Sequence, residues 1–119
     1  MNNAKFEIFT GNDNHYYFRL KAGNGETIGI SEGYRSKQGA SNGMRSVKEN
    51  APYDFNYTIF IGRDDRYYFN LKAGNGEIIL RSQGYATKSG AIAGKDSVKQ
   101  NAPTASTLDL TALGGWAYS

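Results

Sequence analysis

Cysteine is absent from the sequence, histidine occurs once, and no apolar run approaches the roughly 20 residues that span a bilayer. Without cysteine there is neither a disulfide framework nor a thiolate metal site. We therefore expect no metal and no cofactor. The segment 1–5 lacks the apolar stretch of a signal peptide, so the sequence predicts a cytoplasmic protein that does not enter the membrane.

Charge is also scarce and evenly spread. The net charge is +3, and residues 1–51 and 52–103 each carry seven Lys or Arg and five Asp or Glu. A nucleic-acid-binding domain usually gathers a stronger excess of basic residues on one face. The composition therefore does not by itself indicate a nucleic-acid partner.

What the sequence does have is an internal repeat. The segment Tyr16–Pro52 recurs as Tyr67–Pro103 without a gap, and 24 of the 37 positions are identical. A unit of about 50 residues buries too little apolar surface to be stable alone. We therefore predict one compact domain built from repeat 1 (1–53) and repeat 2 (54–103), followed by a C-terminal tail (104–119).

Each repeat has the pattern of three strands and a helix. Alternating apolar residues predict strands at Lys5–Thr10, His15–Ala22 and Glu26–Ser31, with Ile30 facing inward. The pair Asn24-Gly25 predicts a type I′ hairpin turn. Ser36 and Thr87 are predicted helix N-caps, and apolar residues three and four positions apart follow them. The proline after each Asn-Ala pair is expected to end the helix.

Two short segments follow the helices and complete the predicted topology. Tyr53–Phe55 and Thr107–Leu110 each begin soon after an Asn-Ala-Pro sequence, and each is expected to form a fourth strand. The sequence thus predicts an α+β protein. Two tandem β-β-β-α-β repeats form a single antiparallel sheet with exchanged C-terminal strands, and the helices pack on one face.

Three motifs resemble a known family. Leu20–Glu26, Gly33–Lys37 and Ser46–Pro52, together with their copies in the second repeat, are similar to the YegP-like family of small bacterial tandem-repeat proteins. The resemblance covers about residues 4–103. It implies repeats that share one continuous sheet with exchanged C-terminal strands, a function that is uncharacterised, and no catalytic residues to transfer.

The residues give little support for catalysis. No serine is placed beside a base in a recognised motif, and the glycines around Asn24 neither follow a Rossmann strand nor open a helix. We therefore predict that the protein is not an enzyme. A binding or scaffold role, with another protein as the partner, is the interpretation that the sequence favours.

The strand residues predicted to face away from the helices form the candidate binding face. They combine aromatic and basic side chains: Phe9, Tyr17, Arg19, Lys21, Phe60, Tyr68 and Lys72. Such a face can stack and neutralise single-stranded nucleic acid. The same residues also suit cross-strand aromatic pairs or a face covered by another protein, including a second copy in a homodimer. We favour the protein partner over nucleic acid.

The tail supports a separate hypothesis. Spaced leucines precede Gly114-Gly115, and the sequence then ends in a segment that contains Trp116 and Tyr118. This order resembles the processing site of leader peptides, in which a short aromatic core is modified and released. The protein would then be the folded leader of a modified peptide whose core is 116–119. A family-specific extension and the remnant of an expression tag are alternatives.

Overall fold

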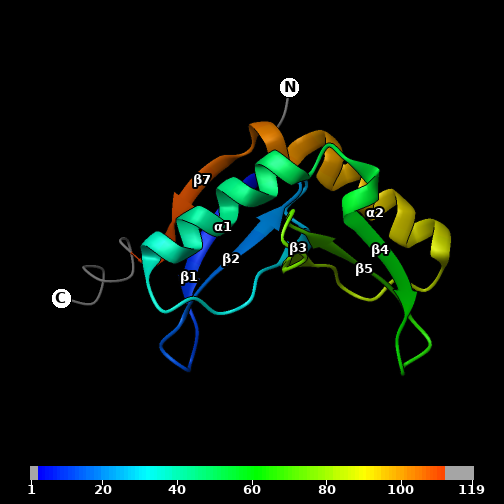
Figure 1. The fold of residues 1–119 in the computed structure, drawn as a ribbon, viewed down its shortest axis with the longest axis horizontal. Coiled ribbons are helices and arrows are strands. Elements are labelled where there is room, and N and C mark those ends of the chain that lie inside the picture. The colour runs from blue at the N-terminus through cyan, green and yellow to red at the C-terminus, as the bar shows by residue number, and fades with distance from the viewer. Residues whose placement is uncertain (1–2, 112–119) are drawn as a thin grey trace.

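The structure, a computed structural model, describes residues 3–111 and consists of one seven-stranded sheet with two α-helices on one side (Figure 1). The elements of repeat 1 are β1 (Lys5–Thr10), β2 (Tyr16–Lys21), β3 (Thr27–Ile30) and α1 (Lys37–Asn50). Those of repeat 2 are β4 (Tyr57–Ile61), β5 (Tyr67–Lys72), β6 (Ile78–Arg81) and α2 (Lys88–Asn101). A final strand, β7 (Ser106–Asp109), follows α2. The predicted α+β class is confirmed.

The helices begin where the sequence predicts. The side chain of Ser36 accepts a hydrogen bond from the Gly39 N–H, and that of Thr87 accepts one from Gly90, each at 3.0 Å. Each helix has 14 residues and buries one face against the sheet. Gly43 lies on that face, and a Cβ there would come within 2.4 Å of the Tyr34 hydroxyl and 3.0 Å of the Phe18 ring. Glycine therefore allows close packing at this position.

The turns between the second and third strands differ from the prediction. Positive φ occurs at Gly25 (88°) and Gly76 (87°), whereas Asn24 is not among the residues with positive φ. The Gly25 N–H donates to the Ala22 carbonyl at 2.9 Å, which places Gly25 at the last position of the turn. A type I turn followed by a left-handed glycine fits these angles, so the type I′ prediction is wrong.

The two repeats meet at the centre of the sheet, whose strand order is β4-β5-β6-β3-β2-β1-β7. β3 and β6 pair antiparallel, with Ile30 opposite Arg81. Beside this pair, Leu80 is fully buried, and a Cβ on Gly29 would lie 2.7 Å from its Cγ atom. Gly29 and Leu80 are the same position of the repeat. One leucine side chain therefore fills the space that the two positions share.

The two edges of the sheet are built differently. β7 pairs with β1, as expected for the Thr107–Leu110 segment, but the pair is parallel, so the sheet is mixed. The corresponding strand predicted at Tyr53–Phe55 does not form, and Asp54–Asn56 is a 3-10 helix instead. Only residues 51–56 separate α1 from β4. A connection between two parallel strands needs a dozen or more residues. This segment is therefore too short to form a strand and then cross over to a parallel β4.

Some predictions fall outside residues 3–111. The tail residues Gly114, Gly115, Trp116 and Tyr118 are among these, so the leader hypothesis stays a prediction. Within the described part of the chain, no helix is long and apolar enough to cross a membrane.

Candidate functional site

The side of the sheet opposite the helices, which we call the outer face, carries one continuous row of side chains. The registers of six strand pairs place one residue of each strand in this row. In sheet order these residues are Leu108, Glu7, Arg19, Ile30, Arg81, Asn70 and Thr58. Both repeats therefore contribute to one surface, and the centre of that surface is the Ile30–Arg81 pair.

In repeat 1 the row contains a charge network around Glu7. This side chain is only 8% exposed, and it accepts a hydrogen bond from the Arg19 Nε at 2.8 Å. The Lys21 Nζ lies 3.5 Å from the same carboxylate oxygen. Burial by itself raises the pKa of Glu7, but Arg19 and Lys21 outweigh it, so the pKa is lower than usual. Two of the cations predicted to face a ligand are thus partly neutralised within the protein.

An aromatic pair lies at the β1–β2 end of the outer face. The rings of Phe9 and Tyr17 stack with centroids 5.6 Å apart, and the Arg19 guanidinium lies 4.5 Å from the Phe9 centroid. The Tyr17 hydroxyl donates to the Asp13 carboxylate at 2.6 Å. That bond lowers the pKa of Asp13 and raises the pKa of Tyr17. The hairpin turn therefore fixes the position of the ring.

Repeat 2 builds the same pair with different surroundings. Phe60 and Tyr68 stack at 5.6 Å, and the Tyr68 hydroxyl donates to Asp64 at 2.5 Å, which lowers the pKa of Asp64. Asn70 stands at the position of Arg19, and Thr58 stands at the position of Glu7. The charge network is therefore absent from this half of the outer face.

Each aromatic pair borders a shallow hollow. The hollow in repeat 1 measures about 410 Å³, and its lining includes Tyr17 and Ile30. The hollow in repeat 2 measures about 250 Å³, and its lining includes Tyr68 and Arg81. Ile30 and Arg81 are the same position of the repeat. We call the first the apolar hollow and the second the basic hollow, because this position sets their different character.

The structure groups the predicted face residues only in part. One aromatic pair joins β1 and β2 and the other joins β4 and β5; β3 and β6 lie between β2 and β5. Three strand spacings of about 4.8 Å put the pairs at least about 14 Å apart. The predicted aromatic residues therefore form two clusters, and Lys72 lies at the other end of β5 from Tyr68.

Three residues of the outer face were missed or misplaced by the sequence reasoning. Ile30, expected to face inward, is 40% exposed on the outer face. The register shifts between Leu20 and Lys21, and such an irregularity changes which side chains share a face. Arg81 and Glu7 could have been found by extending the alternation of the strands across the whole sheet.

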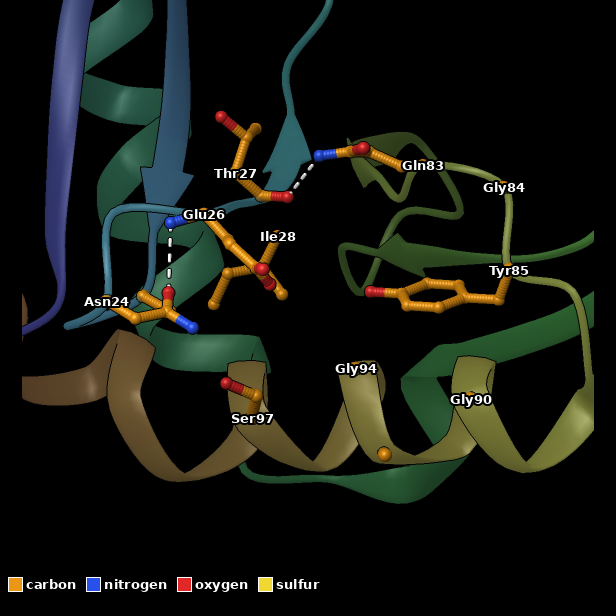
Figure 2. Close-up of a pocket in the computed structure, with 12 residues that line it drawn as sticks. Asn24, Glu26, Thr27, Ile28, Gln83, Gly84, Tyr85, Gly90, Gly94 and Ser97 are labelled. Carbon is orange, nitrogen blue, oxygen red and sulfur yellow. Dashed lines mark hydrogen bonds between the residues drawn. The ribbon is translucent and has the colours of Figure 1, made fainter.

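A second concave region lies between the repeats and has a volume of about 690 Å³. Figure 2 shows the Tyr85 ring above α2, where Gly90, Gly94 and Ser97 lie, and Asn24 and Glu26 on the facing hairpin of repeat 1. The Gln83 side-chain amide donates to the Thr27 carbonyl across this groove (Figure 2). The groove is therefore a seam bridged by hydrogen bonding between the repeats.

The chemistry of this groove is limited. Its ionisable side chains are Glu26 and Tyr85, and burial together with the nearby Glu26 charge raises the pKa of Tyr85. Tyr85 is therefore protonated at neutral pH. Ser97 accepts a hydrogen bond from Asn101 at 3.2 Å, and none of the described residues that line the groove is a histidine or a lysine. Within residues 3–111, no three His, Asp or Glu side chains lie together as metal ligands.

Comparisons with known proteins give a family and no activity. The family described as a domain of unknown function (DUF1508) matches residues 12–57 and again residues 63–109. A UPF0339 protein in the ptx operon 5′ region of Stutzerimonas stutzeri is 44% identical over 105 residues, covering 88% of this chain and 95% of the relative. UPF0339 protein YegP of Escherichia coli K12 is 44% identical over 106 residues, covering 89% and 96%.

Solved structures agree with the fold. The solution structure of yegP from E. coli, titled a protein of unknown function, superposes with a TM-score of 0.86 at 42% identity and covers 92% of this chain and 94% of that one. A UPF0339 protein from Shewanella oneidensis gives a TM-score of 0.85 at 40% identity, with coverage of 91% and 92%. At these identities the similarity covers the sequence as well as the fold.

Proposed function

Because the chain belongs to the DUF1508 family, whose function is not known, we propose a function from the surface itself: a non-enzymatic protein that binds another protein through its outer face. The observation that carries the proposal is the row of side chains across the sheet. At its centre, Ile30 is 40% exposed beside Arg81, and it lines one hollow together with Phe9 and Tyr17. A contiguous group of exposed apolar side chains bordered by polar ones is typical of a protein-binding surface.

The two hollows suggest what the partner offers. The apolar hollow, lined by Phe9, Tyr17 and Ile30, suits an apolar side chain. The basic hollow, lined by Tyr68, Asn70 and Arg81, suits an acidic side chain or a carbonyl group. A partner with an apolar and an acidic group at matching distance would use both repeats at once.

Single-stranded nucleic acid fits this surface less well. Stacking of successive bases requires aromatic side chains close together along a basic path. Here the pairs are at least about 14 Å apart, and each tyrosine hydroxyl is bonded to an aspartate. Arg19 and Lys21 are also already ion-paired with Glu7. A carboxylate beside each ring repels phosphate, and we therefore prefer a protein ligand.

Cytoplasmic location belongs to the same proposal, and fractionation of the native host tests it. The leader hypothesis for Gly114 and Gly115 stays a separate proposal. Mass spectrometry of the protein from its native host tests that hypothesis by showing whether the C-terminus is intact.

The experiment for the outer face is site-specific photo-crosslinking in the native host. A photo-reactive amino acid at position 30 should capture a discrete protein. The same group at Asn42, which is exposed on α1, is the control and should not capture that protein. Phe60→Ser in the position-30 variant should abolish the capture. Crosslinks to nucleic acid alone, or equal capture from positions 30 and 42, would contradict the proposal.

A further inference from the structure

The strand β4 is an open edge of the sheet, whereas its counterpart β1 is covered. β1 pairs with β2 on one side and with β7 on the other, whereas among residues 3–111 β4 pairs only with β5. Figure 1 shows β7 beyond β1 at the left and β4 as the last strand at the right. No described residue thus takes, beside β4, the position that β7 fills beside β1.

Backbone groups of β4 point toward this open side. The Gly62 N–H donates to the Arg66 carbonyl, so Phe60 and Thr58 also bond to β5, in alternation. Ile59 and Ile61 therefore direct their N–H and C=O groups outward. Tyr57 does the same, but its N–H bonds to the Asp54 carbonyl. The free edge thus begins at Ile59.

The side chains of β4 do not protect this edge. Natural edge strands commonly carry lysine, proline or a bulge that blocks further pairing. The strand reads Tyr-Thr-Ile-Phe-Ile and has none of these residues, and Ile61 is 56% exposed. On the neighbouring helix, Ile92 is 37% exposed, where α1 has Ser41. The edge is therefore apolar, and no strand of the described part of the chain pairs with it.

The contacts of β7 with repeat 1 show how a strand sits on such an edge. Asp109 lies opposite Ile8, and its carboxylate is 2.9 Å from the Lys37 Nζ. The Lys48 Nζ donates to the Ala105 carbonyl at 2.9 Å. A lysine near each end of α1 thus holds the strand. One lysine meets a carboxylate, and the other meets a backbone oxygen.

Repeat 2 carries lysines at the same two positions of its helix, beside β4. Lys99 corresponds to Lys48, and it bonds to Asp54 at 2.8 Å, the residue that corresponds to Ala105. Lys88 corresponds to Lys37. It is exposed, and none of the ion pairs within residues 3–111 includes it. Lys99 therefore has a partner, as Lys48 does in repeat 1. Lys88 has no counterpart of the carboxylate that Lys37 meets, among residues 3–111.

We propose that the β4 edge binds an extended segment of another protein as an added parallel strand, with an acidic side chain of that segment paired to Lys88. Main-chain hydrogen bonds to Ile59 and Ile61 would supply affinity, and Lys88 would supply the preference for an acidic residue. This site is the main-chain edge of β4, whereas the basic hollow uses the Phe60 side chain on the outer face. The inference does not depend on the function proposed for the hollows.

The test uses a labelled synthetic peptide with the sequence of residues 104–111, which contains the β7 strand. Fluorescence anisotropy measures its affinity for the full-length protein, and NMR amide shifts locate it. We expect binding that shifts the amides of Ile59, Ile61 and Lys88. Lys88→Glu should weaken binding about fivefold, the upper range for an exposed ion pair. A peptide with lysine in place of its aspartate should recover the loss on that variant.

A backbone variant tests the strand pairing itself. Ile61→Pro removes an outward N–H without removing a bond to β5, and it should weaken binding at least as much as Lys88→Glu. Thr10→Pro, the same change in repeat 1, is the control and should leave the affinity unchanged. Circular dichroism melting verifies that each variant is folded.

Three results would overturn the inference. One is the absence of peptide binding at millimolar concentration to a folded protein, and another is binding that shifts amides outside β4 and α2. The third is a concentration-dependent dimer in analytical ultracentrifugation that Ile61→Pro abolishes, because a second copy would then be the occupant of the edge. Crosslinking from position 30 is unaffected by these results, so the two proposals fail separately.

Discussion

Glu7 and Thr58 occupy the same position in the two repeats, yet one is a buried acid and the other an exposed hydroxyl. The central residues of β1 are buried, whereas β4 has no fully buried residue. The cause is β7, which covers β1 and places Leu108 beside Glu7. In repeat 1 this edge is buried and carries a charge network. In repeat 2 the edge is not buried, and small polar residues stand at the same positions.

The comparison teaches that a tandem repeat need not give equivalent surfaces. The strand that follows α2 can cross to the first repeat, but the six residues 51–56 after α1 must lead directly into β4. Chain connectivity therefore closes one edge and opens the other. The residues at equivalent positions differ accordingly. The covered edge has the charged pair Glu7 and Arg19, and the open edge has the uncharged Thr58 and Asn70.

The largest expected effect is at the centre, where the two repeats share one space. Leu80→Gly should destabilise the protein by about 2–5 kcal/mol, because it leaves a cavity in the core. Gly29→Leu should cost about 1–3 kcal/mol, because its side chain would enter the volume of Leu80. Chemical denaturation of both variants measures these changes in the free energy of unfolding.

The double variant that combines these two changes sharpens the comparison. If the repeats are equivalent at this point, a leucine at position 29 fills the space left at position 80, and much of the lost stability returns. A double-mutant cycle then gives a favourable coupling between the positions. Strictly additive losses would contradict the shared space.

The next effect concerns the charge network that only repeat 1 contains. Glu7→Gln should lower stability at neutral pH by about 1.5–3 kcal/mol through loss of charged hydrogen bonds. The pKa of Glu7 is lowered in the fold, so its contribution is present above the unfolded value of about 4.5 and is lost as the pH falls through the folded value. The gap between wild type and variant should therefore shrink below pH 4.5.

Denaturation curves at several pH values measure this gap. The coupling between Glu7→Gln and Arg19→Gln in a double-mutant cycle should disappear over the same pH range. A gap that stays constant or widens at low pH would show that Glu7 stabilises the sheet by packing and not by its charge.

The smallest effect comes from making repeat 2 resemble repeat 1. The Tyr57 hydroxyl donates to the Ala51 carbonyl at 2.7 Å, and repeat 1 has Phe6 at the same position. Tyr57→Phe should cost about 0.5–1.5 kcal/mol, one hydrogen bond at the end of α1. Tyr53 is 51% exposed, so Tyr53→Phe is the control and should change the melting temperature little. Equal losses from both would mean that the bond to Ala51 contributes nothing.

Much of the fold follows from local patterns. The caps Ser36 and Thr87, the buried helix faces and the repeated hairpins depend on residues close together in the chain, and the sequence predicts them. The parallel pairing of β7 with β1 depends on the path of the chain between them. The 3-10 helix at Asp54–Asn56 is set by the length of the connection, which the strand pattern of Tyr53–Phe55 did not reveal.

The candidate site was predictable to a smaller extent. Alternation along each strand predicts Phe9 and Tyr17, and likewise Phe60 and Tyr68, on one face. Ile30 was assigned to the wrong face because the irregularity at Leu20 and Lys21 shifts the register. The burial of Glu7 and the open edge of β4 arise only when β7 is placed. Those features require the strand order, which no single-repeat pattern contains.

The unequal edges of the sheet are tested most directly by amide hydrogen exchange. The outward amides of Phe6 and Ile8 face β7. The amide of Ile59 occupies the position that corresponds to Ile8 but faces none of the strands within residues 3–111. The account predicts slow exchange at Phe6 and Ile8 and much faster exchange at Ile59 and Ile61. Equal protection at Ile8 and Ile59 in the isolated, monomeric protein would contradict it, because β4 would then be covered like β1.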